Sequence, residues 1–104
     1  MTDDIYKLTD HFPKEEKYGL ASQIQRASVS IVSNIAEGTS RLSDKEKIRY
    51  VEITYGSLME VYCQLCIALD LNYISSQQLN DQKQKIDSIA GKLNALNRAY
   101  QKRL

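Results

Sequence analysis

The residues best suited to chemistry in this 104-residue chain are two cysteines and a single histidine. Cys63 and Cys66 have the C-x-x-C spacing that occurs in zinc sites and in redox pairs. A structural zinc site takes four ligands, but no second cysteine pair exists and His11 belongs to a distant segment. A redox pair normally lies at a helix N-terminus, where the helix dipole lowers the thiol pKa, whereas these cysteines fall inside a predicted helix. We therefore expect free, buried or half-buried cysteines and no metal ion.

The sequence also lacks the combination of residues that acid–base or nucleophilic catalysis needs. His11 could act as a general base only with an oriented partner and a nucleophile, and the adjacent Asp10 points to another side of a helix. Several serines lie between residues 22 and 33, but none belongs to a G-x-S-x-G or S-x-x-K motif. The chain also has no P-loop and no G-x-G-x-x-G motif. We expect a non-enzymatic protein without a cofactor.

Positive charge is concentrated in the last third of the chain. The net charge is only +1, so no global basic field announces a nucleic-acid-binding protein, yet residues 75–104 sum to +4 from six basic and two acidic side chains. The candidate nucleic-acid contacts are Lys92, Arg98, Lys102 and Arg103. Arg98 and Lys102 are four residues apart and share a helix face, which Lys92 and Arg103 need not share. The alternative is a solvated outer face with a frayed terminus.

Apolar side chains repeat at intervals of three and four residues and predict the helices that position these groups. We expect helices at about residues 2–12, 19–37, 44–72 and 76–102, in a single domain spanning residues 1–104. The connections between the second, third and fourth helices are short, so these neighbours should run antiparallel. The predicted fold is all-α, an up-down antiparallel four-helix bundle.

Capping residues and helix breakers set the expected boundaries. We expect helix starts at Thr2, Ser43 and Ser75, and helix ends near Pro13, Gly38 and Asn72. Glu46 completes a capping box with Ser43, and Gln78 completes a weaker one with Ser75. Gly38 is expected to end its helix in a left-handed conformation, which glycine adopts without steric cost.

The segment from residue 19 to residue 36 carries one charged side chain, Arg26, and organises the predicted bundle. One face of it is apolar, with Ile24, Ala27, Ile31 and Ile35. The other side carries serines, alanine and valines instead of charges. A helix that is small or apolar nearly all round is usually buried on several sides. We expect this helix to pack inside its own bundle on one face and against another subunit on a second face.

A few polar residues interrupt these small and apolar regions. Antiparallel pairing of the second and third helices places Arg26 opposite the segment from Gly56 to Glu60. We predict an ion pair between Arg26 and Glu60, and the alternative is that each side chain points separately to water. Asn34 and Glu37 are expected to hold the end of their helix.

Three features bear on the cellular compartment. No stretch approaches 18 consecutive apolar residues, so we expect no transmembrane helix and no membrane partner. The N-terminus, MTDDIYKLTD, starts acidic and lacks the apolar region of a signal peptide. Two cysteines do not suggest a disulfide framework. These features predict a cytoplasmic protein.

Two segments resemble a known family. YKLTDHFPKEEKYGLASQIQRASVSIVSNIAEGTSR and YGSLMEVYCQLCIALDLNYI resemble the four-helix-bundle proteins of the 23S ribosomal RNA intervening-sequence family. The resemblance runs from about Tyr6 to Ile74 and rests on LT-x-x-FP, YGL-x-x-Q, R-A-x-x-S-I-x-x-N-I-A-E-G and GS-x-x-E. The positions that match the family pattern are Arg26, Ser30, Asn34, Glu37, Gly38, Ser57 and Glu60.

This resemblance implies an up-down four-helix protomer that assembles into a ring-shaped homopentamer, with no enzymatic activity. Some members of the family are encoded in insertions within ribosomal RNA genes. A relative, the accessory variability protein of diversity-generating retroelements, is a pentamer that binds nucleic acid and a reverse transcriptase.

The chain departs from the family pattern in two respects. Family members usually carry more of the first helix before the YKLT segment, and a shortened first helix would leave part of the bundle less covered. The retroelement relative is strongly basic, whereas this chain is near neutral, which weakens the case for nucleic-acid binding.

The leading hypothesis is a non-enzymatic, homo-oligomeric scaffold or adaptor that offers a ring surface to RNA, DNA or an RNA-handling protein. The alternative is a purely structural protein-interaction module with no nucleic-acid role.

Overall fold

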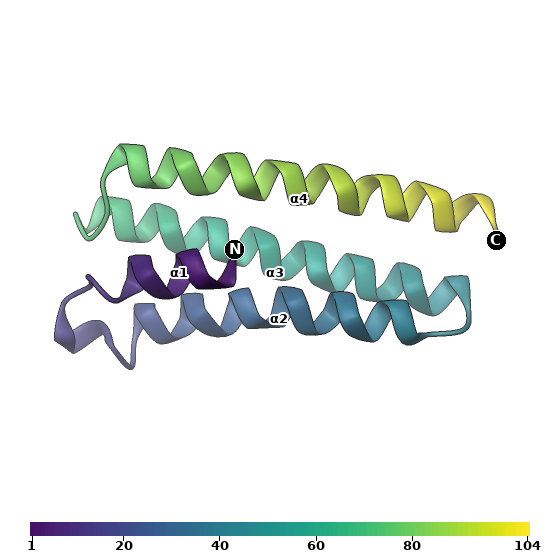
Figure 1. The fold of residues 1–104 in the computed structure, drawn as a ribbon, viewed down its shortest axis with the longest axis horizontal. Helices are drawn as coiled ribbons and strands as arrows, with labels where there is room; N and C mark the ends of the chain where they lie inside the picture. Colours follow the sequence, from purple (N-terminus) through teal and green to yellow (C-terminus); the bar gives the residue numbers. More distant parts are fainter.

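The computed structural model describes all residues, Met1–Leu104, and contains four α-helices and no strand. The helices are α1 (Thr2–Thr9), α2 (Leu20–Ser40), α3 (Asp44–Asp70) and α4 (Ser76–Lys102), with a 3-10 turn, η1 (Lys14–Glu16), between α1 and α2. The prediction of an all-α chain with four helices is confirmed. The molecule is elongated, 47 × 24 × 18 Å, and its three long helices lie along the long axis (Figure 1). No helix combines the length and the apolar character that crossing a membrane requires.

The short helix α1 lies between α2 and α4. Its contact with α2 includes a hydrogen bond of 2.9 Å from the Gln25 Nε2 to the Thr9 hydroxyl. Its contact with α4 includes an ion pair between Asp4 and Lys85. α1 has 8 residues whereas α4 has 27, so α1 covers only one end of the gap between α2 and α4 (Figure 1).

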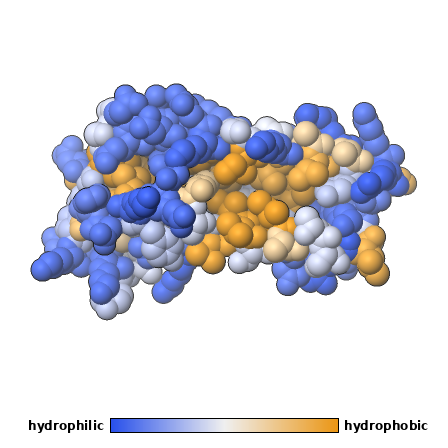
Figure 2. Space-filling model, in the orientation of Figure 1, coloured by the Kyte–Doolittle hydropathy of each residue, from blue (hydrophilic) through white to orange (hydrophobic).

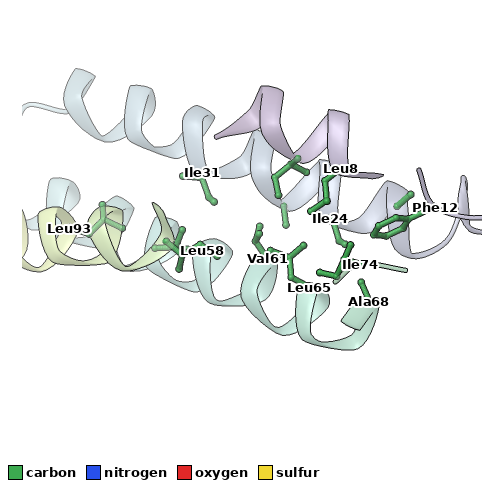
Figure 3. Close-up of a cluster of buried hydrophobic side chains, with 14 residues drawn as sticks. Leu8, Phe12, Ile24, Ile31, Leu58, Val61, Leu65, Ala68, Ile74 and Leu93 are labelled. Carbon is green, nitrogen blue, oxygen red and sulfur yellow. The ribbon is translucent and has the colours of Figure 1, made fainter. Parts of the chain in front are cut away.

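The hydrophobic core is densest at the end that α1 covers. Ile5 of α1, Ile24 of α2 and Leu65 of α3 have no exposed surface there. Figure 3 shows Ile24 and Leu65 in this part of the cluster. Phe12, just after α1, packs its ring 5.3 Å from that of Tyr73, which precedes α4. The core continues along the molecule through Leu58 and thins out towards Leu93, near the other end of the cluster (Figure 3).

Three expected helix boundaries are wrong. α1 ends at Thr9 instead of near Phe12, and the Thr9 hydroxyl donates back to the carbonyl oxygen of Ile5 over 2.9 Å. Its N-terminal cap is Met1, and Thr2 lies inside the first turn. α2 runs through Gly38 to Ser40, and Gly38 is not left-handed. A Cβ atom on Gly38 would lie 2.9 Å from the Cβ atom of Tyr50, so the glycine allows close approach of α2 and α3 instead of ending the helix.

The expected end of α3 is confirmed at Asn72. This residue has a φ of 62°, and its N–H donates to the Leu69 carbonyl while the N–H of Tyr73 donates to the Ala68 carbonyl. The two bonds form the Schellman arrangement, in which asparagine replaces the usual glycine.

Both serine caps form, but the box at Ser75 has both of its hydrogen bonds and the cap at Ser43 has only one. The Ser43 Oγ accepts a hydrogen bond of 3.1 Å from the backbone N–H of Glu46. The Ser75 Oγ accepts a bond of 3.1 Å from the N–H of Gln78, whose side-chain oxygen accepts in return from the N–H of Ser75 over 2.8 Å. The glutamine box, which the sequence ranks as weaker, is therefore the reciprocal one.

Candidate interaction surface

The small polar residues of α2 and α3 meet where these helices pack together. The Ser30 and Ser57 hydroxyls lie 3.0 Å apart across the two helices. The Asn34 Nδ2 donates to both the carbonyl oxygen and the Oγ of Ser30, over 2.8 and 2.9 Å. Small side chains allow the two backbones to approach, and the hydrogen bonds satisfy their half-buried polar atoms. These three residues therefore hold α2 against α3.

The same contact continues to the end of α2. Gly38 is buried against Tyr50, and the Arg41 Nη2 donates to the Tyr50 hydroxyl over 2.9 Å. The Arg41 guanidinium also lies 5.0 Å from the Tyr50 ring centroid and pairs with Glu37 at 3.1 Å. The hydrogen bond to Tyr50 raises the pKa of Arg41 above its ordinary value. Glu37 thus acts through Arg41 to hold this end of the helix pair.

The predicted ion pair between Arg26 and Glu60 is wrong. Both side chains are exposed, and Glu60 instead accepts a hydrogen bond of 3.3 Å from the Nε2 of Gln64 on its own helix. Because Ser30 meets Ser57, Arg26 lies one turn away from that contact, beside the α3 segment that the sequence predicts. Exposed charges gain little from pairing and lose side-chain entropy, so both are solvated in the single chain.

The outer face of α2 is exposed and carries valines beside the charged Arg26. Ile24, Ala27 and Ile31 are buried as expected, on one face. On the opposite side, Val29 is 43% exposed and Val32 is 57% exposed. Within one chain, α2 is therefore buried on one face only.

Three exposed apolar side chains lie along one side of α3, with the charged Glu60 between the first two. Ile53 and Ile67 lie fourteen residues apart, close to four helical turns, and are therefore on one face. Leu71, just after the end of α3, lies one turn beyond Ile67. All three side chains are between 39% and 49% exposed. Ile67 and Leu71 are neighbours on the surface, and neighbouring exposed apolar side chains mark interaction surfaces more often than single ones do.

The four basic candidates of α4 divide between two sides of the helix. Arg98 and Lys102 share one side, and Lys92 and Arg103, eleven residues apart, share another. Arg103 is already engaged, because its Nη2 donates to Asp44 over 2.7 Å and its guanidinium lies 5.0 Å from the Tyr100 ring centroid. The other three basic side chains are exposed and form no ion pair. No single cluster of four basic residues exists.

The cysteines lie on α3 without a disulfide. Cys66 is half-buried as expected, but Cys63 is exposed, because it lies on the outer side of the helix. A hydrogen bond with Cys66 raises the pKa of Tyr62 above its ordinary value. No group of three histidine, cysteine, aspartate or glutamate side chains lies close enough together to hold a metal ion.

Comparison with known protein families gives one match. The family model described as 23S rRNA-intervening sequence protein matches residues 1–95. The chain belongs to the 23S rRNA-intervening sequence protein family. The match covers the whole contact between α2 and α3, with all seven motif positions, whereas Arg98, Lys102 and Arg103 lie beyond it. No curated protein shows a significant match to this member of the family.

Proposed function

We propose that this protein is a non-enzymatic, homo-oligomeric scaffold whose copies meet through the outer faces of α2 and α3. The exposed valines on the outer face of α2 carry this proposal. These valines are as apolar as core residues, and exposure of Val29 and Val32 in a lone chain costs hydrophobic free energy that a second copy would recover.

The two apolar faces differ, which favours a ring. The α2 face of one copy would pack on the side of α3 that carries Ile53, Ile67 and Leu71 in the next copy, and such heterologous contacts form rings when the rotation between copies closes. Arg26 and Glu60 lie on these faces, and because both are exposed they are free to pair between copies. A homopentamer is the ring size that the resemblance implies, together with a relationship to the accessory variability protein of diversity-generating retroelements. Within each copy we propose an up-down antiparallel arrangement, supported by contacts that run in opposite order along α2 and α3, from Ser30 with Ser57 to Gly38 with Tyr50.

A role with RNA follows from the family description and from one basic surface. The family is described by its association with 23S rRNA intervening sequences, and we propose that this member acts in the cytoplasm on RNA, DNA or an RNA-handling protein. Arg98 and Lys102 form the phosphate-binding surface in this proposal, because they share an exposed face and have no acidic partner.

The second candidate function is a protein-interaction module without a nucleic-acid role. The net charge of +1 favours this candidate, and so does the engagement of Arg103 by Asp44, which removes one of the four basic groups from the surface. Proteins that bind nucleic acid mainly through phosphates usually carry a larger positive field.

A mobility-shift series with structured RNA and duplex DNA separates the two candidates. Binding through phosphates should weaken steeply as salt increases. The double variant Arg98→Glu/Lys102→Glu should abolish the shift, whereas Lys45→Glu, an exposed charge reversal at the start of α3, should leave it nearly unchanged. No shift even at low salt would exclude the nucleic-acid role and leave the protein-interaction module.

A further inference from the structure

A groove of about 220 Å³ lies between α3 and α4. It is lined by Val51, Glu52 and Tyr55 of α3 and by Asn94 and Asn97 of α4. Three of these five side chains are polar, whereas the face between α2 and α4 exposes hydrophobic surface (Figure 2). The groove between α3 and α4 therefore suits a ligand that has both an apolar surface and hydrogen-bonding edges.

Tyr55 gives this groove a flat aromatic wall. The side chain is 36% exposed, and its ring packs on no other aromatic ring and under no cation of the chain. Tyr50, on the same helix, is by contrast engaged by Arg41 through both its hydroxyl and its ring. Proteins that recognise single strands stack unpaired bases on exposed aromatic rings. The ring of Tyr55 is free to stack in this way.

Glu52 and the two asparagines place hydrogen-bonding groups beside that ring. Glu52 is three residues before Tyr55 on the same flank of α3, is exposed and forms no ion pair. Asn94 is exposed, and Asn97 accepts one bond of 3.4 Å from the Nε2 of Gln101. An ionised carboxylate only accepts hydrogen bonds. Guanine is the one RNA base whose Watson–Crick edge offers it two neighbouring donors, N1–H and N2–H₂.

The phosphate-binding surface proposed above adjoins the groove. Arg98 lies four residues after Asn94, so the two side chains share a face of α4 about 6 Å apart along the axis. Lys102 follows one turn later, and neither basic side chain has an acidic partner. On the other side of Asn94, nothing lies within 4 Å of a Cβ atom added to Gly91, so the face is open there. One nucleotide can therefore place its base in the groove and its phosphate on Arg98.

We propose that this groove binds an unpaired guanine nucleotide of an RNA strand. The guanine ring stacks on Tyr55, its N1–H and N2–H₂ groups donate to the Glu52 carboxylate, and its phosphate contacts Arg98. The proposal rests on the nucleic-acid role proposed above and adds a base preference to it. Stacking and base hydrogen bonds add affinity that does not depend on net charge, which suits RNA binding by a chain of net charge +1.

Fluorescein-labelled RNA octamers test the base preference with the full-length protein. Each octamer is a uracil strand with one central guanine, adenine or inosine nucleotide, and fluorescence anisotropy measures its affinity. The guanine octamer should bind about tenfold more tightly than the adenine octamer, because adenine cannot donate twice to one carboxylate. Inosine lacks the N2 amino group, so its octamer should fall between the other two.

Variants locate the base site. Glu52→Gln should bring the guanine and adenine octamers to similar affinities, whereas Glu46→Gln, which removes the same charge elsewhere on α3, should keep the preference. Tyr55→Leu should weaken binding of all three octamers about tenfold through lost stacking, and Tyr55→Phe should not. Tyr6→Leu is the control for the loss of an exposed tyrosine, since Tyr6 is 46% exposed on α1. Circular dichroism checks that each variant keeps its helices.

The outcomes separate the groove from the wider nucleic-acid role. Equal affinities for guanine and adenine octamers, or a preference that Glu52→Gln leaves intact, would overturn the guanine site while RNA binding itself stands. If no octamer binds, the nucleic-acid role fails, and NMR titration with guanosine monophosphate decides about the groove. Shifts of the Tyr55 ring signals that adenosine monophosphate does not cause would keep the guanine site and reject RNA as its source. No shift would overturn the guanine site as well.

Discussion

The two ends of this molecule carry similar apolar patterns but differ in burial. At the end covered by α1, Ile24 has no exposed surface. At the other end, Ile35 lies on the same face of α2 and is 41% exposed. The side chain and the helix are the same, and only the facing element differs. The three- and four-residue spacing of apolar side chains shows which face of a helix can be buried. Whether a given side chain on that face is buried depends on the helix that packs against it.

The two ends are also held together differently. The covered end gains the polar contacts of α1, from Thr9 to Gln25 and from Asp4 to Lys85. The open end depends on the close approach of α2 and α3 at Gly38 and on the contact of Arg103 with Asp44. Substitutions at the covered end should therefore act through lost core packing or lost contacts of α1, and substitutions at the open end through a steric clash between α2 and α3.

The largest expected effect compares two isoleucines of one helix. Ile24→Ala should lower the free energy of unfolding by about 2–5 kcal/mol, because it leaves a cavity among fully buried neighbours. Ile35→Ala should cost less than about 1 kcal/mol in the single chain, since much of this side chain already faces water. Urea denaturation measures both values. Equal losses of unfolding free energy in the two variants would show that Ile35 is covered in solution, and would contradict the difference in burial between the two ends.

The next effect concerns the close contact at the open end. Gly38→Ala should lower the free energy of unfolding by about 1–3 kcal/mol, because the new Cβ atom would lie 2.9 Å from that of Tyr50. Gly91→Ala is the matched control on α4, where nothing lies within 4 Å of an added Cβ atom. Its higher helix propensity should raise stability by about 0.5–1 kcal/mol. The same denaturation series checks both variants, and a gain from Gly38→Ala would contradict the close approach.

The smallest effect concerns the ion pair that joins α1 to α4. The hydrogen bond from Lys85 lowers the pKa of Asp4 below its ordinary value of 3.8. A lowered carboxyl pKa stabilises the folded state above the unfolded pKa, and this contribution is lost as pH falls through the folded pKa. Lys85→Gln should therefore cost less than about 1 kcal/mol at pH 7, because both groups are partly exposed, and almost nothing at a pH below the folded pKa of Asp4.

NMR titration of the Asp4 carboxyl and denaturation at both pH values test this expectation. Lys83→Gln is the control, because Lys83 pairs with Asp87 within α4 and does not reach α1. The Asp4 pKa should rise in Lys85→Gln and stay unchanged in Lys83→Gln. A similar pKa in all three proteins would mean that the ion pair does not form in solution.

Local features of the fold could be predicted from the sequence. The four helices follow from apolar spacing, and Ser43, Ser75 and Asn72 mark boundaries that depend on residues within one turn. Gly38 could not be placed in this way, because glycine suits both a helix end and a close helix contact, and only Tyr50 on the facing helix decides between them.

Features that depend on more than one element were harder to predict. The positions of Arg26 and Glu60 along their helices follow from antiparallel pairing, but whether the charged groups meet depends on side-chain direction and solvation. The exposure of Leu96 depends on which element faces α4, which apolar spacing on α4 does not encode. The pairing of Lys85 with Asp4 joins two helices that are far apart in the sequence, so local spacing could not predict it.

Light scattering of the purified protein at micromolar concentration tests the central claim, that copies meet through the outer faces of α2 and α3. The account predicts a particle several times the 11.9 kDa of one chain, about fivefold for the proposed ring. Val29→Glu should reduce the particle to a single chain of unchanged helix content, while Tyr6→Glu, on the exposed side of α1, should keep the native mass. A native protein that remains a stable 11.9 kDa monomer would contradict the account.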